Sequence, residues 1–313
     1  MKKHISPVLL LITALIWGSA FVAQKAASEI TPFALSGARG AIAVLAIIPI
    51  VILFDRVSKN GRRFFSFKKG EKFIDINGYE LAGGVICGIL LFVATALQQS
   101  GIHTGTDAGK AAFITALYVV IVPVFGLFLK RPSPLNAWIS VGIAVVGFYL
   151  LCIKENFSVE SSDMLILLCT FAFAAQILAV DIFLPKADGV RLSLIQFATV
   201  AILGTVFAFI FEGGAPFSPI SECIPQLLFL GIGSSGIAYT LQIVGQKGTH
   251  PAVASIILSL ESVFGALAGA VILQEKMSLR EYVGCAVVFV AVILSELDFG
   301  TLFKKKNLSN ENK

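Results

Sequence analysis

The chain of 313 residues is 57% hydrophobic and only 14% charged, with a mean hydropathy of +0.88. A soluble domain carries roughly 45–50% apolar and about 25% charged residues, so this composition argues against a soluble protein and indicates a membrane protein. The net charge of +5 is small and the basic residues form no patch interleaved with aromatics, which argues against nucleic-acid binding.

Apolar runs follow one another along the whole chain. A helix needs about 20 apolar residues to cross the roughly 30 Å hydrocarbon layer, and ten runs reach about that length. The first run is longer than the apolar part of a signal peptide, so we expect it to be retained. The fold class expected is all-α integral membrane, with ten transmembrane helices at 7–27, 33–53, 80–100, 108–128, 135–153, 163–184, 191–211, 225–246, 251–273 and 279–297.

Lysine and arginine are distributed unequally between the two sides of this arrangement. With the N-terminus inside, about eighteen fall on the inner side and four, Lys25, Lys154, Lys276 and Arg280, on the outer side. Basic residues are retained on the cytoplasmic side. We therefore expect a cell-membrane protein with both termini in the cytoplasm and a basic cytoplasmic tail over 299–313.

Short likenesses recur in the same order in the two halves of the chain. They predict two five-helix repeats, 1–153 and 154–298. Because five is an odd number, the second repeat enters the membrane from the opposite side, which gives inverted-topology repeats. The matching segments are LQQSG at 97–101 with LQIVG at 241–245, PVFG at 123–126 with SVFG at 262–265, and VG at 141–142 with VG at 283–284.

Glu261 lies in the middle of the ninth run, within SLESVFGALAG at 259–269. A charged residue at mid-helix costs about 2.5–3.5 kcal/mol, which the apolar residues of this run offset at roughly 0.3–0.6 kcal/mol each. We expect the carboxylate to face the bundle interior or a wet cavity. Three roles remain open: a structural acid bonded to backbone or Ser259, a carboxylate that exchanges a proton, or a direct contact for a solute.

Several further polar residues fall inside the predicted helices. Arg39, whose counterpart in the second repeat is Gln196, either extends to the membrane surface, pairs with a carboxylate or holds an anionic group of a solute. Gln98 and Gln242 either bond across helices or contact a ligand. Lys110, beside Asp107, is expected to be an interfacial anchor.

Trp17, Tyr118, Gln176 and Tyr239 fall near mid-depth, where aromatic rings with a polar tip suit a cavity wall. Ordinary core packing is the alternative for each of them. Pro123 removes one backbone hydrogen bond and is expected to bend the fourth helix near Tyr118.

Four segments carry a resemblance to a known family: ALIWGSAFVAQKA at 14–26, ALSGARGAIAVLAI at 34–47, GKAAFITALYVVIVPVFGLFL at 109–129 and SIILSLESVFGALAGAVILQEKMSLREYVGCAVVFVAVIL at 255–294. The chain resembles EamA-type members of the drug/metabolite transporter superfamily from about Pro7 to Leu297. The resemblance implies a ten-helix secondary carrier for small metabolites, amino acids, nucleobases or drugs, with export favoured over uptake. The family's usual proline after the acid is Ser262 here, which implies a weaker kink.

The hypothesis is therefore an alternating-access carrier with a central cavity between its two halves. Its expected partners are a small-molecule solute, the lipid bilayer and, if transport is proton-coupled, protons exchanged at Glu261. A passive uniporter or channel-like facilitator is the alternative, and the chain is expected to be a monomer or homodimer. The expected substrate-binding residues are Trp17, Arg39, Gln98, Tyr118, Gln176, Tyr239, Gln242 and Glu261.

We expect no enzyme, metal site or cofactor. The histidines, His4, His103 and His250, lie at helix ends or in loops, and the chain has no G-x-S-x-G motif and no CxxC pair. A channel usually needs rings of identical charges or carbonyls about an axis, which this chain does not offer.

Overall fold

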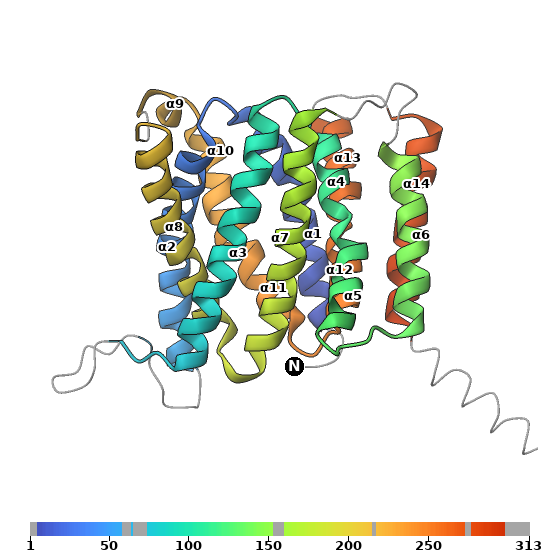
Figure 1. Ribbon diagram of the computed structural model, residues 1–313, viewed down its shortest axis with the longest axis horizontal. Coiled ribbons are helices and arrows are strands. Elements are labelled where there is room, and N and C mark those ends of the chain that lie inside the picture. Colours follow the sequence, from blue (N-terminus) through green and yellow to red (C-terminus); the bar gives the residue numbers. More distant parts are fainter. Residues whose placement is uncertain are drawn as a thin grey trace, which may run out of the picture.

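The computed structural model describes residues 5–57, 64, 74–152, 160–214, 217–272 and 277–297. Lys2, Lys3 and the tail expected over 299–313 lie outside these residues. The described chain forms helices that pack side by side in one bundle (Figure 1). The uninterrupted long helices are α1 (Ile5–Ala26), α2 (Pro32–Val57), α3 (Gly78–His103), α6 (Leu135–Cys152), α7 (Ser161–Phe183), α8 (Gly189–Phe211) and α14 (Leu279–Glu296).

Eight helical stretches of the described chain are long and apolar enough to cross a membrane, which confirms a multi-pass membrane protein. They correspond to eight of the ten expected runs. Of the other two, α6 offers a shorter apolar stretch, Leu135–Leu151. Helix α14 carries Arg280 and Glu281 in its first turn and Glu296 at its end, so its apolar part is also short.

Polar caps fix where several of these helices begin. At α3, Glu80 N donates to the Asn77 side chain and Asn77 N donates to the Glu80 carboxylate, a reciprocal capping box. The Asp188 side chain accepts from two backbone N–H groups at the start of α8. These caps satisfy backbone donors that have no partner within the helix, so α3 starts ahead of the apolar run expected at 80–100.

Three of the expected spans are interrupted. The fourth divides into α4 (Ala108–Ala116) and α5 (Tyr118–Phe128), and the break lies at Leu117, more than a turn before Pro123. The ninth divides into α12 (Pro251–Leu258) and α13 (Glu261–Ile272), although no proline follows Glu261. The eighth consists of α10 (Ile224–Leu228), the π-helix η2 (Phe229–Ala238) and α11 (Tyr239–Gln246).

Helices α2 and α8 form one edge of the bundle, and α6 and α14 form the other (Figure 1). Helices α1, α3, α7 and the interrupted spans lie between the edges. Short segments η1 (Leu184–Lys186) and α9 (Phe217–Glu222) join α7 to α8 and α8 to α10. The central helices therefore surround the middle of the molecule, and the edge pairs flank it.

Both edge pairs are held close along their length and tied at both ends. A β-carbon on Gly37 of α2 would lie 2.8 Å from the Thr205 nitrogen of α8, so only glycine permits this approach. At one end of this pair, the Glu212 carboxylate accepts from Thr31 Oγ1 at 2.7 Å. At the other end, Arg191 pairs with Asp55 at 2.8 Å.

The second edge pair, α6 and α14, is tied in a similar way. Asn136 donates to the Ser295 and Leu297 carbonyl oxygens at 2.9 Å at one end. At the other end, the Arg280 guanidinium lies 5.2 Å from the centre of the Tyr149 ring. Four separate polar contacts thus hold the two edges of the bundle.

Candidate solute-binding cavity

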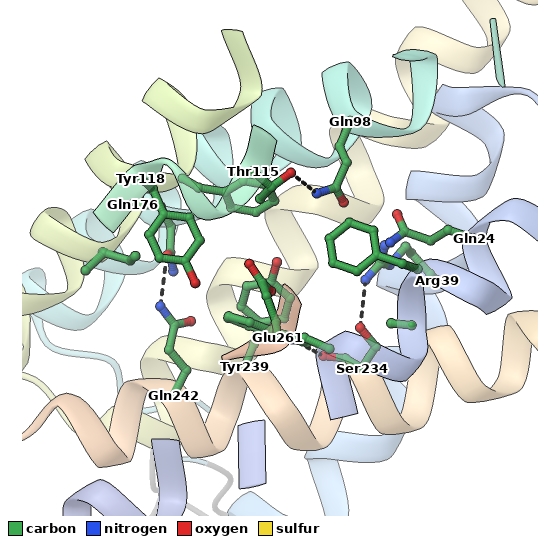
Figure 2. Close-up of a pocket in the computed structure, with 15 residues that line it drawn as sticks. Gln24, Arg39, Gln98, Thr115, Tyr118, Gln176, Ser234, Tyr239, Gln242 and Glu261 are labelled. Atoms are coloured by element: carbon green, nitrogen blue, oxygen red, sulfur yellow. Dashed lines mark hydrogen bonds between the residues drawn. The ribbon is translucent and has the colours of Figure 1, made fainter. Parts of the chain in front are cut away.

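A buried cavity lies among the central helices (Figure 2). Its volume of about 30 Å³ is room for roughly two water molecules. All eight residues expected to contact a solute line it, and their part in binding stays a prediction. The other lining residues are Ala20, Phe21, Gln24, Thr115, Phe173, Ile177 and Ser234.

Arg39 projects from α2 into the cavity and is only 5% exposed, so it does not extend to the membrane surface. Its Nε donates to Ser235 Oγ at 2.9 Å and its Nη2 donates to Ser234 Oγ at 3.3 Å. In the part of the chain that the structure describes, no carboxylate forms an ion pair with it. The guanidinium is thus a buried cation held by two neutral hydroxyl groups.

The π-helix places these two serines. Its backbone bonds run to the fifth residue along the chain, which widens the helix and is frequent at functional sites. Trp17 Nε1 donates to the Ser234 carbonyl oxygen at 3.2 Å, and Thr13 Oγ1 donates to the Ala238 carbonyl oxygen at 3.1 Å. Donors from α1 thus bond two carbonyl groups of the widened segment.

Glu261 is the first residue of α13 and is 4% exposed. One carboxylate oxygen, Oε1, is buried without a hydrogen-bond partner, and no described basic residue forms an ion pair with the group. The hydrogen bond considered with Ser259 is wrong, because that hydroxyl donates to the Ile256 carbonyl oxygen at 2.7 Å. Ser262 instead ties the span to α4 by donating to the Ala112 carbonyl oxygen at 2.8 Å.

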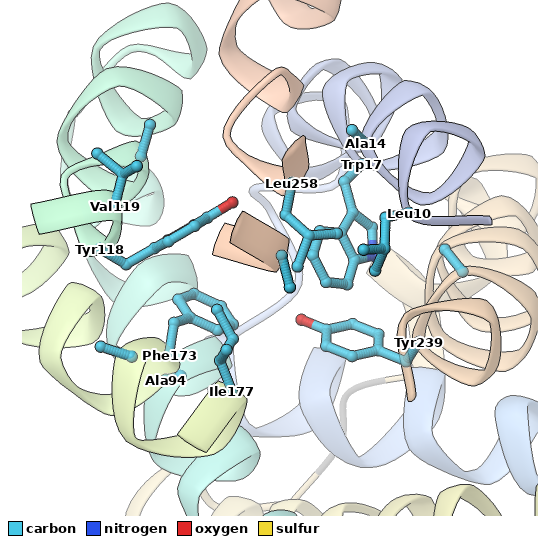
Figure 3. Close-up of a cluster of buried hydrophobic side chains, with 14 of the residues drawn as sticks. Leu10, Ala14, Trp17, Ala94, Tyr118, Val119, Phe173, Ile177, Tyr239 and Leu258 are labelled. Carbon is cyan, nitrogen blue, oxygen red and sulfur yellow. The ribbon is translucent and has the colours of Figure 1, made fainter. Parts of the chain in front are cut away.

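Two tyrosines face Glu261 from opposite sides. Figure 3 shows the hydroxyl groups of Tyr118 and Tyr239 pointing toward the middle of the buried cluster. The Tyr118 hydroxyl is close enough to interact with the Glu261 carboxylate but does not meet it in hydrogen-bonding geometry. The Tyr239 ring packs against Trp17, with ring centres 4.5 Å apart. Tyr118 and Tyr239 therefore lie near the acid, and Trp17 supports the Tyr239 ring.

Glutamine side chains connect the cavity wall across helices. Gln242 Nε2 donates to Gln176 Oε1 at 3.1 Å, and Gln176 Nε2 donates to Gln196 Oε1 at 3.1 Å. Gln98 Nε2 donates to Thr115 Oγ1 at 3.0 Å. The Oε1 atoms of Gln24 and Gln242 are buried without a partner. The amide nitrogens thus serve as links between helices, while two amide oxygens stay free to accept from a ligand.

Two further charged residues, Lys110 and Asp181, are not part of the cavity lining. Lys110, expected to be an interfacial anchor, pairs with Asp163 of α7 at 2.6 Å. Asp181, near the other end of α7, pairs with Arg131. The first pair joins α4 to α7, and the second joins the turn after α5 to α7.

Sequence reasoning missed the polar cavity residues Gln24, Thr115 and Ser234. Gln24 lies seven residues after Trp17, a spacing that puts both on one helix face, so it could have been found. The sequence spacing of Ser234 gave no such indication, because the π-helix determines which face of the span carries this residue.

Comparison with known proteins places the chain in a family. The model of the EamA-like transporter family matches residues 4–153 and again residues 160–297. An uncharacterized transporter of Archaeoglobus fulgidus is 29% identical over 299 residues, which are 95% of this chain and 87% of that protein. The uncharacterized transporter YoaV of Bacillus subtilis is 22% identical over 296 residues, 91% of this chain and 94% of that protein.

A solved structure described only as a crystal structure of a protein matches with a TM-score of 0.72 at 16% identity. The match covers 93% of this chain and 96% of that one, and at this identity it shows the fold alone. Since the family model matches both halves of the chain, the protein belongs to the EamA-like transporter family, within the drug/metabolite transporter superfamily.

Proposed function

We propose that the protein is an alternating-access secondary carrier that moves a small polar solute through the central cavity. The observation that carries this proposal is a cavity among the central helices whose lining includes a buried cation, a buried acid and unpaired acceptor atoms. Buried polar groups without partners are costly in a folded protein. Four such atoms line this cavity, on Gln24, Tyr118, Gln242 and Glu261, and a bound solute would supply their missing partners.

The proposed architecture is ten transmembrane helices in two inverted repeats, 1–153 and 154–298. One family model matching twice supports this division. Cavity residues also recur at a constant spacing: Phe173 follows Trp17 by 156 residues, and Ile177 follows Phe21 by the same interval. In Figure 1, α1 and α7 run in opposite directions, as inverted repeats require.

Helix packing supports the same symmetry. In the first half of the chain, α3, α4 and α5 pack against α7. In the second half, the corresponding elements pack against α1: η2 and α11 correspond to α3, and α12 and α13 correspond to α4 and α5. The two interrupted spans correspond as well, because Glu261 follows Tyr118 by 143 residues and each begins a half-helix at the cavity. The cavity then lies on the pseudo-two-fold axis.

Proton coupling at Glu261 forms part of the proposal. The carboxyl group is buried in the cavity and has no basic partner among the described residues. The titratable groups that face it are Tyr118, Tyr239 and Cys169, and Arg39 lines the same cavity. A carboxyl group in this position can take up a proton when the solute leaves and release it when the solute returns.

We also propose a cell-membrane location with both termini in the cytoplasm. The unequal distribution of lysine and arginine supports this orientation. The family resemblance favours export as the direction of net flux.

Counterflow in proteoliposomes tests the transport proposal. Vesicles preloaded with unlabelled L-alanine, uridine, glucose or rhodamine 6G are diluted into the labelled form of the same compound. We expect saturable, transient accumulation of one of them. The variant Ala20→Trp, which fills the cavity wall, abolishes it, whereas Leu45→Trp on the exposed face of α2 leaves it unchanged. Flux that rises linearly with concentration, or that Ala20→Trp does not reduce, contradicts the proposal.

A further inference from the structure

Two buried groups of opposite charge share the cavity and do not pair with each other. Arg39 is held by Ser234 and Ser235, and Glu261 faces Tyr118 and Tyr239. A buried charge without an opposite partner costs several kcal/mol. A buried cation and a buried acid that are kept apart in one cavity are both paired by a ligand that carries the complementary charges, and the acid holds a proton while the cavity is empty.

Each group has capacity left for a ligand. Two of the five N–H groups of the Arg39 guanidinium donate to serines. The remaining N–H groups include the pair on Nη1, so part of the planar fork that binds carboxylates stays open. At the other charged group, Glu261 Oε1 is buried and accepts no hydrogen bond.

The other unpaired atoms in the cavity wall add to this pattern. Gln24 Oε1 and Gln242 Oε1 are buried acceptors without a donor, and both side chains line the cavity. An ammonium group has three N–H donors and no acceptor, so it can donate to Glu261 Oε1 and to a further unpaired acceptor of the wall. The adjoining rings of Trp17 and Tyr239 present faces that also attract a cation.

We propose that the solute is a zwitterion of the amino-acid type, whose carboxylate binds Arg39 and whose ammonium binds Glu261. This inference rests on the proposed function and names its substrate class. A solute with only an anionic or only a cationic group would leave one buried group unpaired. A zwitterion satisfies both and adds no net charge to the cavity.

The same contacts couple solute binding to a proton. A proton and the ammonium group of the solute are alternative partners of the Glu261 carboxylate. When the solute binds, the O–H bond of the protonated acid breaks, the proton leaves to water and the ammonium takes its place. The two occupants exclude each other, so the carrier returns with a proton after it has released the solute.

Three matched probes test the charge requirement: L-alanine, ethylamine, which lacks the carboxylate, and propionate, which lacks the amine. Binding to the purified protein is measured by the shift in thermal unfolding and by calorimetry. L-leucine, 3-methylbutylamine and 4-methylpentanoate form a second set with a larger side chain. We expect the wild-type protein to bind one amino acid at least about tenfold more tightly than both of its single-charge analogues, equivalent to about 1.4 kcal/mol.

Two substitutions should alter the preference in opposite ways. Glu261→Gln removes the discrimination between the amino acid and the carboxylate analogue, whereas Arg39→Gln removes the discrimination between the amino acid and the amine. A merely structural role would weaken all three probes equally. The wild-type comparison needs no variant, so the proposal can be tested even if a substitution prevents folding.

The zwitterion proposal is overturned if the folded wild-type protein binds an analogue as tightly as the amino acid, or binds neither amino acid. Counterflow separates this failure from failure of the transport proposal. Saturable exchange of uridine, glucose or rhodamine 6G that Ala20→Trp abolishes would retain the carrier and reject the zwitterion. Non-saturating flux would reject the carrier itself.

Discussion

Individual side chains in the cavity show how a few polar residues are held inside an apolar bundle. Arg39 does not take its position from an opposite charge but from the hydroxyl groups of Ser234 and Ser235. Hydrogen bonds to a charged group contribute about 1.5–3 kcal/mol when buried. These hydroxyl groups therefore determine both the stability and the direction of the guanidinium.

Replacing Ser235 with alanine tests this at the residue scale. We expect Ser235→Ala to lower the free energy of unfolding by about 1–3 kcal/mol, because the buried Nε–H of Arg39 loses its acceptor. The matched control is Ser19→Ala, which removes an exposed hydroxyl bonded to the Leu15 carbonyl oxygen of its own helix. Thermal unfolding in detergent measures both, and equal melting temperatures for the two variants would contradict the assignment.

His250 provides a pH-dependent residue outside the membrane spans. Burial lowers the pKa of His250 and the positive charge of Arg131 lowers it further, while a hydrogen bond to the Pro132 carbonyl oxygen opposes the shift. The ring nitrogen Nδ1 accepts from Ala252 N at the start of α12. Because the unfolded chain binds this proton more readily, the stabilisation is present above the ordinary pKa of histidine, about 6.5, and is lost as the pH falls below it.

We therefore expect acidification from pH 7.5 to pH 5 to lower the melting temperature less in His250→Asn than in the wild-type protein. Asparagine retains a side-chain acceptor for the helix start and does not titrate. His103→Asn is the control histidine substitution, since it lies at the C-terminal end of α3. An unchanged pH profile in His250→Asn would show that this cap does not respond to protonation.

At the scale of helices, the interruptions matter more than the spans themselves. All three interruptions adjoin the cavity. The two breaks place Tyr118 and Glu261 at the first position of the half-helix that follows, and the π-helix η2 contains Ser234. Non-helical backbone inside a membrane is tolerated where its polar groups find partners in the protein. Helix α1 supplies such partners through Thr13 and Trp17.

Thr13→Val tests the contribution of α1 to the π-helix. The Thr13 hydroxyl is shared between the Leu9 carbonyl oxygen of its own helix and the Ala238 carbonyl oxygen. The substitution keeps the shape of the side chain but removes the bond to Ala238, so we expect a loss of about 1–3 kcal/mol in unfolding free energy. Thr95→Val is the matched buried control, because its hydroxyl bonds only to carbonyl groups of its own helix. The interpretation fails if Thr95→Val destabilises the protein as much as Thr13→Val does.

The helices themselves were predictable because each apolar run has one stable form in lipid, a helix that satisfies its own backbone. The breaks were not, because Leu117 and the segment around Ser234 resemble their apolar neighbours in composition. Their conformation depends on contacts with other helices, such as the bond from Trp17 to Ser234. Pro123 directed attention to the correct span but not to the site of its break.

The cavity was partly predictable for a related reason. A polar residue inside an apolar run must turn away from lipid, which directed Arg39, Gln242 and Glu261 toward the interior. The structure places all eight candidates around one cavity, and their role in transport stays a prediction. The partners of Arg39 could not be inferred, because they lie almost two hundred residues away in the chain.

The whole molecule combines two tied edges with a centre made of interrupted helices. Each edge pair joins a helix from one proposed repeat to a helix from the other and is tied at both ends. In the proposed carrier, the edges serve as pivots while the central helices tilt around the cavity. Since about 30 Å³ holds roughly two waters, admitting an amino acid requires such a movement.

Accessibility of a single cysteine at Ala20 tests alternating access most directly. Ala20 lines the cavity and is buried, so a cysteine there fits with little change of volume. The substitution Ala20→Cys is made after the native cysteines are replaced by alanine or serine: Cys87, Cys152, Cys169, Cys223 and Cys285. A membrane-impermeant thiol reagent is then applied from one side of oriented vesicles at a time.

The account predicts that the cysteine of Ala20→Cys reacts with the reagent from either side. When L-alanine is added or the proton gradient is changed, the reaction rate from one side should rise while the rate from the other side falls. A pore would instead expose the cysteine to both sides together, with no reciprocal change. Reaction from one side only under every condition, or from neither, would contradict a cavity that opens alternately to the two faces of the membrane.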